Sequence, residues 1–137
     1  MKITHTDIYR FSIPIHPFTI ATGTMLFAQN MFVRVFTDAG IHGVGECSAF
    51  PMIVGETQNT CLEMAKDFAA LWSGKDALAI PERMAELHAF TAYNSTAKSA
   101  FDMALYDIAS KHAGQPLFQF LGGVAKKMET DLTVGID

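Results

Sequence analysis

The sequence predicts an α+β fold, in which a three-stranded antiparallel meander is followed by a helical bundle. Two observations carry this prediction: β-type segments are grouped before residue 50, and stripes with helical spacing occupy residues 57–121. Strands grouped ahead of helices are typical of α+β domains, whereas alternating strands and helices would indicate a parallel sheet. A last segment, residues 129–136, returns to strand character without a neighbouring strand in the sequence.

The first strand is predicted from Lys2 to about Ile15, because apolar residues there recur with a period of two. Those that share a parity are Ile3, Tyr9, Phe11, Ile13 and Ile15. Pro14 and Pro17 restrict pairing, so residues 16–27 are expected to form a loop, although an unusually apolar one.

Two further strands are predicted over residues 30–37 and 41–49, joined by the short turn Asp38-Ala39-Gly40. Gly43 and Gly45 in the second of them indicate a bulge or a close approach of another backbone. Residues 50–56 are expected to form a second apolar loop.

Three apolar stripes then predict helices. The first helix extends from about Thr57 to Gly74, Pro81 opens the second, and the third has Ser95 or Thr96 as its N-cap and ends at Gly114. The stripes are Cys61, Ala65, Phe68 and Trp72; Met84, Leu87 and Phe90; and Ala97, Ala100, Phe101, Ala104, Leu105 and Ile108. Residues 116–121 are expected to add one further helical turn.

The composition excludes several classes of protein. The 137 residues carry a formal charge of -4, which argues against a nucleic-acid partner. Half of the residues are hydrophobic and 18% are charged, which excludes a disordered chain. We expect a soluble cytoplasmic protein without a membrane partner, because no signal peptide or membrane-spanning run is evident. Cys47 and Cys61 are expected to be reduced thiols in the core.

The polar residues do not form a complete active site. The five histidines are scattered, so no metal ligands are expected among them: His5, His16, His42, His88 and His112. Asp102 and Asp107 lie about 140° apart on their helix and are expected to cap or to form salt bridges. Glu46 and Glu56 are interpreted as structural carboxylates, the latter at the start of the first helix.

Three stretches taken together resemble a known family. They are NMFVRVFTDAGIHGVGE at residues 30–46, AFDMALYD at residues 100–107, and LGG at residues 121–123 followed by ETDLTVGID at residues 129–137. Their order and spacing resemble the N-terminal part of the enolase superfamily, in its muconate-lactonizing branch. Within that branch the chain is most similar to the dipeptide epimerases related to L-Ala-D/L-Glu epimerase.

The resemblance implies a division of the chain and a reaction. Residues 1–125 would form the capping domain, and residues 126–137 a linker and the first strand of a TIM barrel whose remainder is absent from these residues. Such epimerases remove the proton α to a dipeptide's carboxylate, with Mg²⁺ stabilising the enediolate and lysines serving as base and acid. The resemblance places these lysines and the metal ligands on barrel strands, so no catalytic or metal-binding residue is expected in this chain.

The resemblance does imply substrate contacts. Two capping-domain loops, here residues 16–27 and 50–56, would close over the barrel mouth. The arginine expected to hold a substrate glutamate aligns with Gly23, so we expect a preference for apolar dipeptides. Phe18, Ile20 and Ile53 are candidate wall residues, and Thr133 would face the substrate. The alternative is that the three apolar residues only pack a loop against the barrel.

Two other functions stay open. A related enzyme of the same branch, such as a cycloisomerase, an o-succinylbenzoate synthase or an N-acylamino-acid racemase, would share this capping domain. A non-catalytic α+β binding module is the alternative of a different class. The sequence also leaves assembly into a homo-oligomer open.

Overall fold

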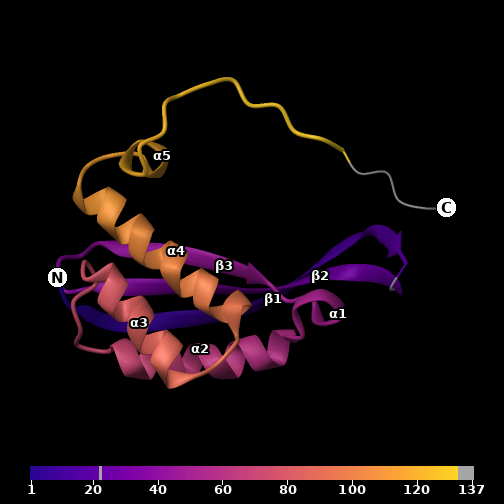
Figure 1. Ribbon diagram of the computed structural model, residues 1–137, viewed down its shortest axis with the longest axis horizontal. Helices are drawn as coiled ribbons and strands as arrows, with labels where there is room; N and C mark the ends of the chain where they lie inside the picture. Colours follow the sequence, from indigo (N-terminus) through magenta and orange to yellow (C-terminus); the bar gives the residue numbers. More distant parts are fainter. Residues whose placement is uncertain (22, 133–137) are drawn as a thin grey trace.

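The computed structural model describes residues 1–21 and 23–132. In chain order its elements are β1 (Ile3–Ile20), β2 (Gly23–Thr37), β3 (His42–Ser48), α1 (Pro51–Val54), α2 (Gln58–Trp72), α3 (Ile80–Phe90), α4 (Ser95–His112) and α5 (Leu117–Phe120). The strands form one antiparallel sheet in the order β1-β2-β3. Helices α2, α3 and α4 cover one face of this sheet (Figure 1). The predicted α+β architecture is therefore confirmed.

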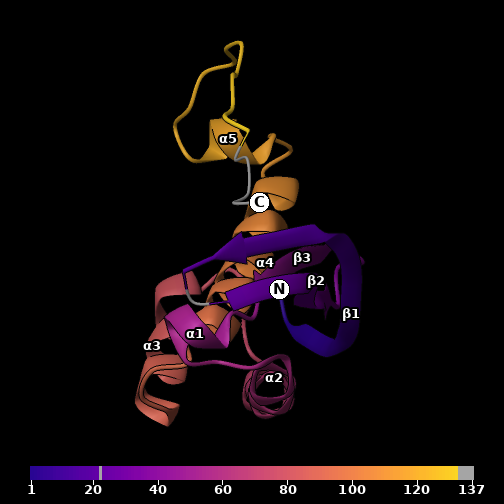
Figure 2. The ribbon, with the colours of Figure 1, turned by 90° about the vertical axis from the view of Figure 1, so that its right-hand side faces the viewer.

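The core lies between the central strand and the helices. Met31, Val33 and Val35 alternate along β2 and are fully buried. Phe32 lies on the opposite face of the sheet and contacts the rings of Tyr9 and Phe11. Seen along the sheet in Figure 2, the strands curl around the side that carries the helices.

The prediction that alternate residues of β1 continue to share the face of Ile3 is wrong beyond the first residues of the strand. Pairing with β2 shifts register between Ile3 and His5, which changes the face on which the later residues lie. Ile3 is buried, but it is Ile8 that then packs against the core. Tyr9, expected on the same face as Ile3, is 42% exposed.

The expectation of a loop over residues 16–27 is also wrong. β1 continues to Ile20 and β2 begins at Gly23, so the hairpin extends well beyond β3 (Figure 1). Pro14 pairs with Phe27 and Phe18 with Met25, which leaves three residues of β1 opposite one residue of β2. This irregularity accommodates Pro17, and β1 is an edge strand, where proline is tolerated.

The first and third helices agree with their predicted stripes. Thr57 is the N-cap of α2 and forms a capping box with Thr60, and the whole predicted stripe of α2 is buried. The predicted stripe of α4 is buried as well, but its N-cap is Asn94 and not Ser95 or Thr96 as predicted. Helix α3 agrees only in part, because Leu87 is fully buried while Phe90 is 50% exposed.

Two glycines of β3 let α4 approach the sheet. A Cβ atom on Gly45 would lie 1.8 Å from the carbonyl oxygen of Ala100, and one on Gly43 would lie 2.0 Å from that of Ala104. The predicted close approach of backbones is confirmed. Asp107 fixes the same contact, because its carboxylate accepts hydrogen bonds from the Val44 amide at 2.9 Å and from Lys111 at 2.6 Å.

The chain after α5 carries no helix or strand over residues 121–132 (Figure 1). The expected barrel strand begins at residue 129, and residues 133–137 lie outside the described part of the chain, so this expectation stays a prediction. In the same described part, no helix is long and apolar enough to cross a membrane. Cys47 and Cys61 are free and buried, as expected.

Candidate functional site

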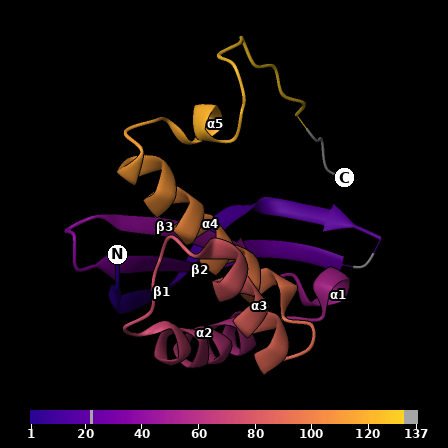
Figure 3. The ribbon, with the colours of Figure 1, turned by 60° about the vertical axis from the view of Figure 1, so that its left-hand side comes forward.

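Two apolar segments lie side by side at one end of the molecule. We call the outer part of the β1–β2 hairpin, residues 14–21 and 23–27, the hairpin arm, and residues 50–56 the α1 segment. The α1 segment was expected to be a loop and contains one helical turn, which ends at Gly55 with φ of 73°. Figure 3 shows α1 beside the outer end of the hairpin. We call the two segments together the lid.

The two segments enclose an open hollow of about 320 Å³. Its lining is mostly apolar and comes from both segments and from the strand residues at their base: Thr24, Met25, Leu26, Phe27, Gln29, Ala49, Phe50, Pro51 and Met52. A hollow of this volume is the size of a small-molecule site. The lid therefore brings together apolar residues that lie more than 20 positions apart in the sequence.

Large apolar side chains around the hollow are exposed. The exposed fractions are 54% for Leu26, 49% for Phe27, 49% for Met52, 67% for Ile53 and 43% for Val54. Single exposed apolar residues are ordinary, but a contiguous group marks a surface that a ligand or another part of a protein covers.

The structure places four of the five predicted site residues in this lid. Phe18 and Ile20 lie on the arm, half-buried, paired with Met25 and Gly23 respectively. Ile53 lies on α1 and is exposed. Thr133, the fifth, lies outside the described residues.

Gly23 is the point at which the arm meets α1. Its φ is 138°, a backbone conformation that residues other than glycine rarely adopt. A Cβ atom at this position would lie 3.8 Å from the sulfur of Met52. A side chain longer than a methyl group at this position would therefore compete with Met52 for space. The predicted Gly23 site is thus next to a thioether of α1.

Sequence reasoning missed Met25 and Met52, which line the hollow. The pairing of Met25 with Phe18 in the hairpin places Met25 in the lid. The sequence could not indicate this, because these residues were expected to form a loop, which has no strand pairing. Methionine is unbranched and polarisable, so it adapts its shape to a variable apolar partner.

The lid offers no strong cation to a ligand. The sequence contains no Lys or Arg between residues 13 and 33, nor between residues 50 and 56. The one acidic group of the α1 segment, Glu56, is 6% exposed and bonded to backbone amides of α4. A carboxylate buried in this hollow would lack an ionic partner and would be strongly disfavoured.

The described residues also provide no metal site and no exposed thiol. Over residues 1–21 and 23–132, no three His, Cys, Asp or Glu side chains lie close enough to hold a metal ion. Hydrogen bonding to the sulfur of Cys47, together with burial, raises the pKa of the Cys61 thiol, so that group stays a neutral thiol in the core. The lid therefore offers a ligand an apolar surface.

Comparison with known proteins identifies a family. The family described as "Mandelate racemase / muconate lactonizing enzyme, N-terminal domain" matches residues 3–122. The chain is 40% identical to a D-Ala-D/L-Ala epimerase of Cytophaga hutchinsonii, over 100% of this chain and 38% of that protein. It is 35% identical to an L-Lys-D/L-Arg epimerase of Desulforapulum autotrophicum, over 99% of this chain and 39% of that protein.

A third relative is a hydrophobic dipeptide epimerase of Enterococcus faecalis, 34% identical over 100% of this chain and 39% of that protein. A crystal structure of the dipeptide epimerase of Cytophaga hutchinsonii, complexed with Mg and D-Ala-L-Val, superposes with a TM-score of 0.97 at 40% identity. That superposition covers 100% of this chain and 38% of the other. The chain thus spans less than two fifths of the length of the relatives it matches.

Proposed function

Because this chain belongs to the family of mandelate racemase and muconate lactonizing enzyme N-terminal domains, we propose that it is the substrate lid of a Mg²⁺-dependent dipeptide epimerase that prefers apolar dipeptides. The epimerase would remove the proton α to the dipeptide's carboxylate and return it to the opposite face. The lid would choose the side chain that lies next to that carbon.

The position of the Met52 side chain, 3.8 Å from where a Cβ atom on Gly23 would lie, is the observation that carries the apolar preference. Where a cationic side chain would hold a substrate glutamate, this lid has a glycine, and the neighbouring space contains a methionine thioether. Met25 and Phe27 extend the apolar lining. An apolar side chain gains about 25 cal/mol for each Å² that it buries against such a surface, whereas a carboxylate would lose its hydration without a partner.

The lid's contribution to the mechanism is to exclude water. When the apolar arm and α1 segment close over a dipeptide, they replace solvent near the reacting carbon and so strengthen the electrostatic interactions that stabilise the developing enediolate. The described residues do not fit a Mg²⁺ site. In this proposal the metal ligands and the proton-transferring lysines belong to the part of the relatives' length that this chain does not span.

The relatives support the reaction class. The relatives from Cytophaga hutchinsonii, Desulforapulum autotrophicum and Enterococcus faecalis are all named epimerases, and the last is named for hydrophobic dipeptides. The L-Lys-D/L-Arg epimerase shows that relatives of similar identity differ in substrate charge. In this proposal the choice among substrates rests on the residues of the lid.

The reaction is tested by proton exchange in the full-length protein. With Mg²⁺ in D₂O, we expect NMR to show loss of the α-proton signal of the C-terminal residue of L-Ala-L-Ala and the appearance of its diastereomer. Substrates of cycloisomerases, o-succinylbenzoate synthases and N-acylamino-acid racemases serve as parallel samples. Turnover confined to one of those samples would contradict the proposed reaction, and turnover of none would favour a binding module.

A further inference from the structure

We propose that Glu56 and Gln58 are positioning residues that hold the α1 segment and the hairpin arm at a fixed separation, and so set the size of the side chain that the lid accepts. This inference rests on the proposed function for its substrate. Its structural part stands on the contacts of two buried polar side chains that flank Thr57, the N-cap of α2.

Gln58 ties α2 to the base of the hairpin arm. Its side chain is buried, with 6% of the residue exposed, and its amide nitrogen donates to the carbonyl oxygens of Phe11 at 2.9 Å and Asn30 at 2.8 Å. Phe11 and Asn30 face each other across β1 and β2, just before the arm begins. The hydroxyl of Ser12 lies 3.5 Å from the amide oxygen of Gln58. One side chain therefore holds both strands of the arm at their base.

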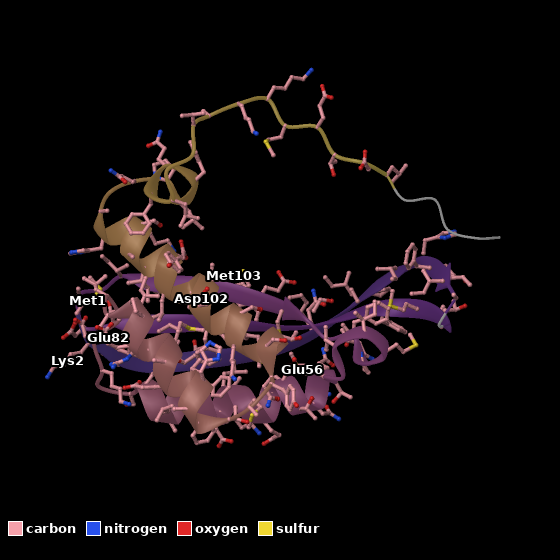
Figure 4. All side chains as sticks on the ribbon, viewed as in Figure 1. Met1, Lys2, Glu56, Glu82, Asp102 and Met103 are labelled. Atoms are coloured by element: carbon pink, nitrogen blue, oxygen red, sulfur yellow. The ribbon has the colours of Figure 1, made fainter. Side chains whose placement is uncertain are left out.

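Glu56 ties the end of the α1 segment to α4. One of its carboxylate oxygens accepts from the Thr96 amide at 3.0 Å, and the other accepts from the Ala97 amide at 3.2 Å. Ser95 and the Cys61 thiol add longer contacts, at 3.5 and 3.7 Å. Figure 4 labels Glu56 where the N-terminal ends of α2 and α4 approach each other. Hydrogen bonds from backbone amides at a helix N-terminus to a carboxylate are strong, because the helix dipole adds to them.

This contact also satisfies a helix end that lacks its own cap. Asn94, the N-cap of α4, is in a left-handed conformation with φ of 52° and makes no capping hydrogen bond with its side chain. Glu56 supplies the missing acceptor from a segment about 40 residues earlier. Since α4 packs closely against β3 at Gly43 and Gly45, the end of the α1 segment is fixed to the helix that approaches the sheet there.

The residue before the α1 segment is tied to the base of the arm as well. The amide of Ala49 donates to the carbonyl oxygen of Gln29 at 2.9 Å, directly beside the residues held by Gln58. Both lid segments therefore leave the core at neighbouring points, and Glu56 fixes the far end of the α1 segment on α4. The hollow of about 320 Å³ lies between the segments so held.

Two variants of the full-length protein separate the two anchors. Gln58→Leu removes the donated hydrogen bonds with little change in volume, and Glu56→Gln brings an N–H group against the amides of α4. Glu63→Gln is the matched control, because Glu63 lies exposed on α2 in a surface salt bridge with Lys66. Hydrogen–deuterium exchange is expected to accelerate in residues 14–27 for Gln58→Leu and in residues 50–55 and the first turn of α4 for Glu56→Gln, with residues 100–110 unchanged.

Kinetics then test the effect on selection. For each anchor variant we expect the ratio of kcat/KM between a dipeptide with a small C-terminal side chain and one with a bulky apolar side chain to change by about tenfold. The change should lie in KM, with kcat within about twofold of the unsubstituted protein. Glu63→Gln should change neither value.

Three results would overturn the inference. They are amide hydrogen–deuterium exchange that accelerates uniformly along the chain, amide exchange that does not change in the lid, and a loss of kcat/KM that is proportional for every dipeptide. The first and third would mean that Glu56 and Gln58 serve stability alone. If the unsubstituted protein exchanges no α proton, the proposed function fails. The pattern of amide hydrogen–deuterium exchange in the two variants then still decides whether Glu56 and Gln58 anchor the lid.

Discussion

Gly45 shows how a single missing methyl group sets the distance between two elements. Its hydrogen faces the carbonyl of Ala100, and a Cβ atom would lie 1.8 Å from that oxygen. Gly45→Ala should therefore push α4 away from the sheet and lower the free energy of unfolding by about 2 kcal/mol or more. Chemical denaturation of the full-length protein measures this loss. Ser48→Ala, at an exposed site on the same strand, should leave stability unchanged.

Asp102 on α4 is expected to make stability depend on pH. Burial raises the pKa of its carboxyl, and the nearby His88 only partly opposes this. The folded state thus binds the proton more tightly than the unfolded chain, so the carboxyl opposes folding once the pH rises through its folded-state pKa.

Asp102→Asn should therefore stabilise the protein at pH 7 by about 0.5 kcal/mol or less, and the gain should vanish below about pH 4. Unfolding measured across that pH range checks the sign, with Asp67→Asn on the exposed face of α2 as the control. A gain that persists unchanged at pH 3 would contradict the role of the charge.

Individual residues differ in how well the sequence predicts them. The role of Gly43 and Gly45 could be predicted, because glycine weakens the interior of a strand and usually marks a bulge or a close backbone approach. Glu56 could not be assigned correctly: its place before α2 suggested that helix as its partner, but its carboxylate binds the amides of α4. Nothing local reveals an acceptor that serves a helix about 40 residues away.

At the scale of elements, the hairpin arm is where sequence reasoning failed most. Two prolines in β1 indicated an end of pairing at Pro14, but the strand passes them through an irregularity and continues to Ile20. A periodic pattern cannot show this, because three residues of one strand face one residue of the other and the alternation breaks. Helices α2 and α4 were predictable, because their stripes are long and uninterrupted.

The exposed face of α1 provides a direct test of the lid as an element. Ile53 is 67% exposed, so Ile53→Ser should leave the melting temperature unchanged. If the side chain forms part of the wall around a bound dipeptide, KM for apolar dipeptides should rise about three- to tenfold, with kcat nearly constant. An unchanged KM would mean that Ile53 only packs against another part of the protein.

For the whole molecule, the proposed function separates selection from chemistry. The described residues form a lid with a packed base, and no three of their His, Cys, Asp or Glu side chains lie close enough to hold a metal ion. We therefore expect the 137-residue chain by itself to exchange no α proton of L-Ala-L-Ala in D₂O with Mg²⁺. Exchange above the rate of a buffer blank would contradict this division of roles.

Substrate preference of the full-length protein tests the central claim most directly. With Mg²⁺ present, kcat/KM should be measured for L-Ala-L-Ala, L-Ala-L-Phe and L-Ala-L-Glu. Because the lid has an apolar hollow and no cation at Gly23, the better of the two apolar dipeptides should exceed L-Ala-L-Glu by about 100-fold or more. If L-Ala-L-Glu is instead the fastest of the three substrates, the lid does not select as its structure implies.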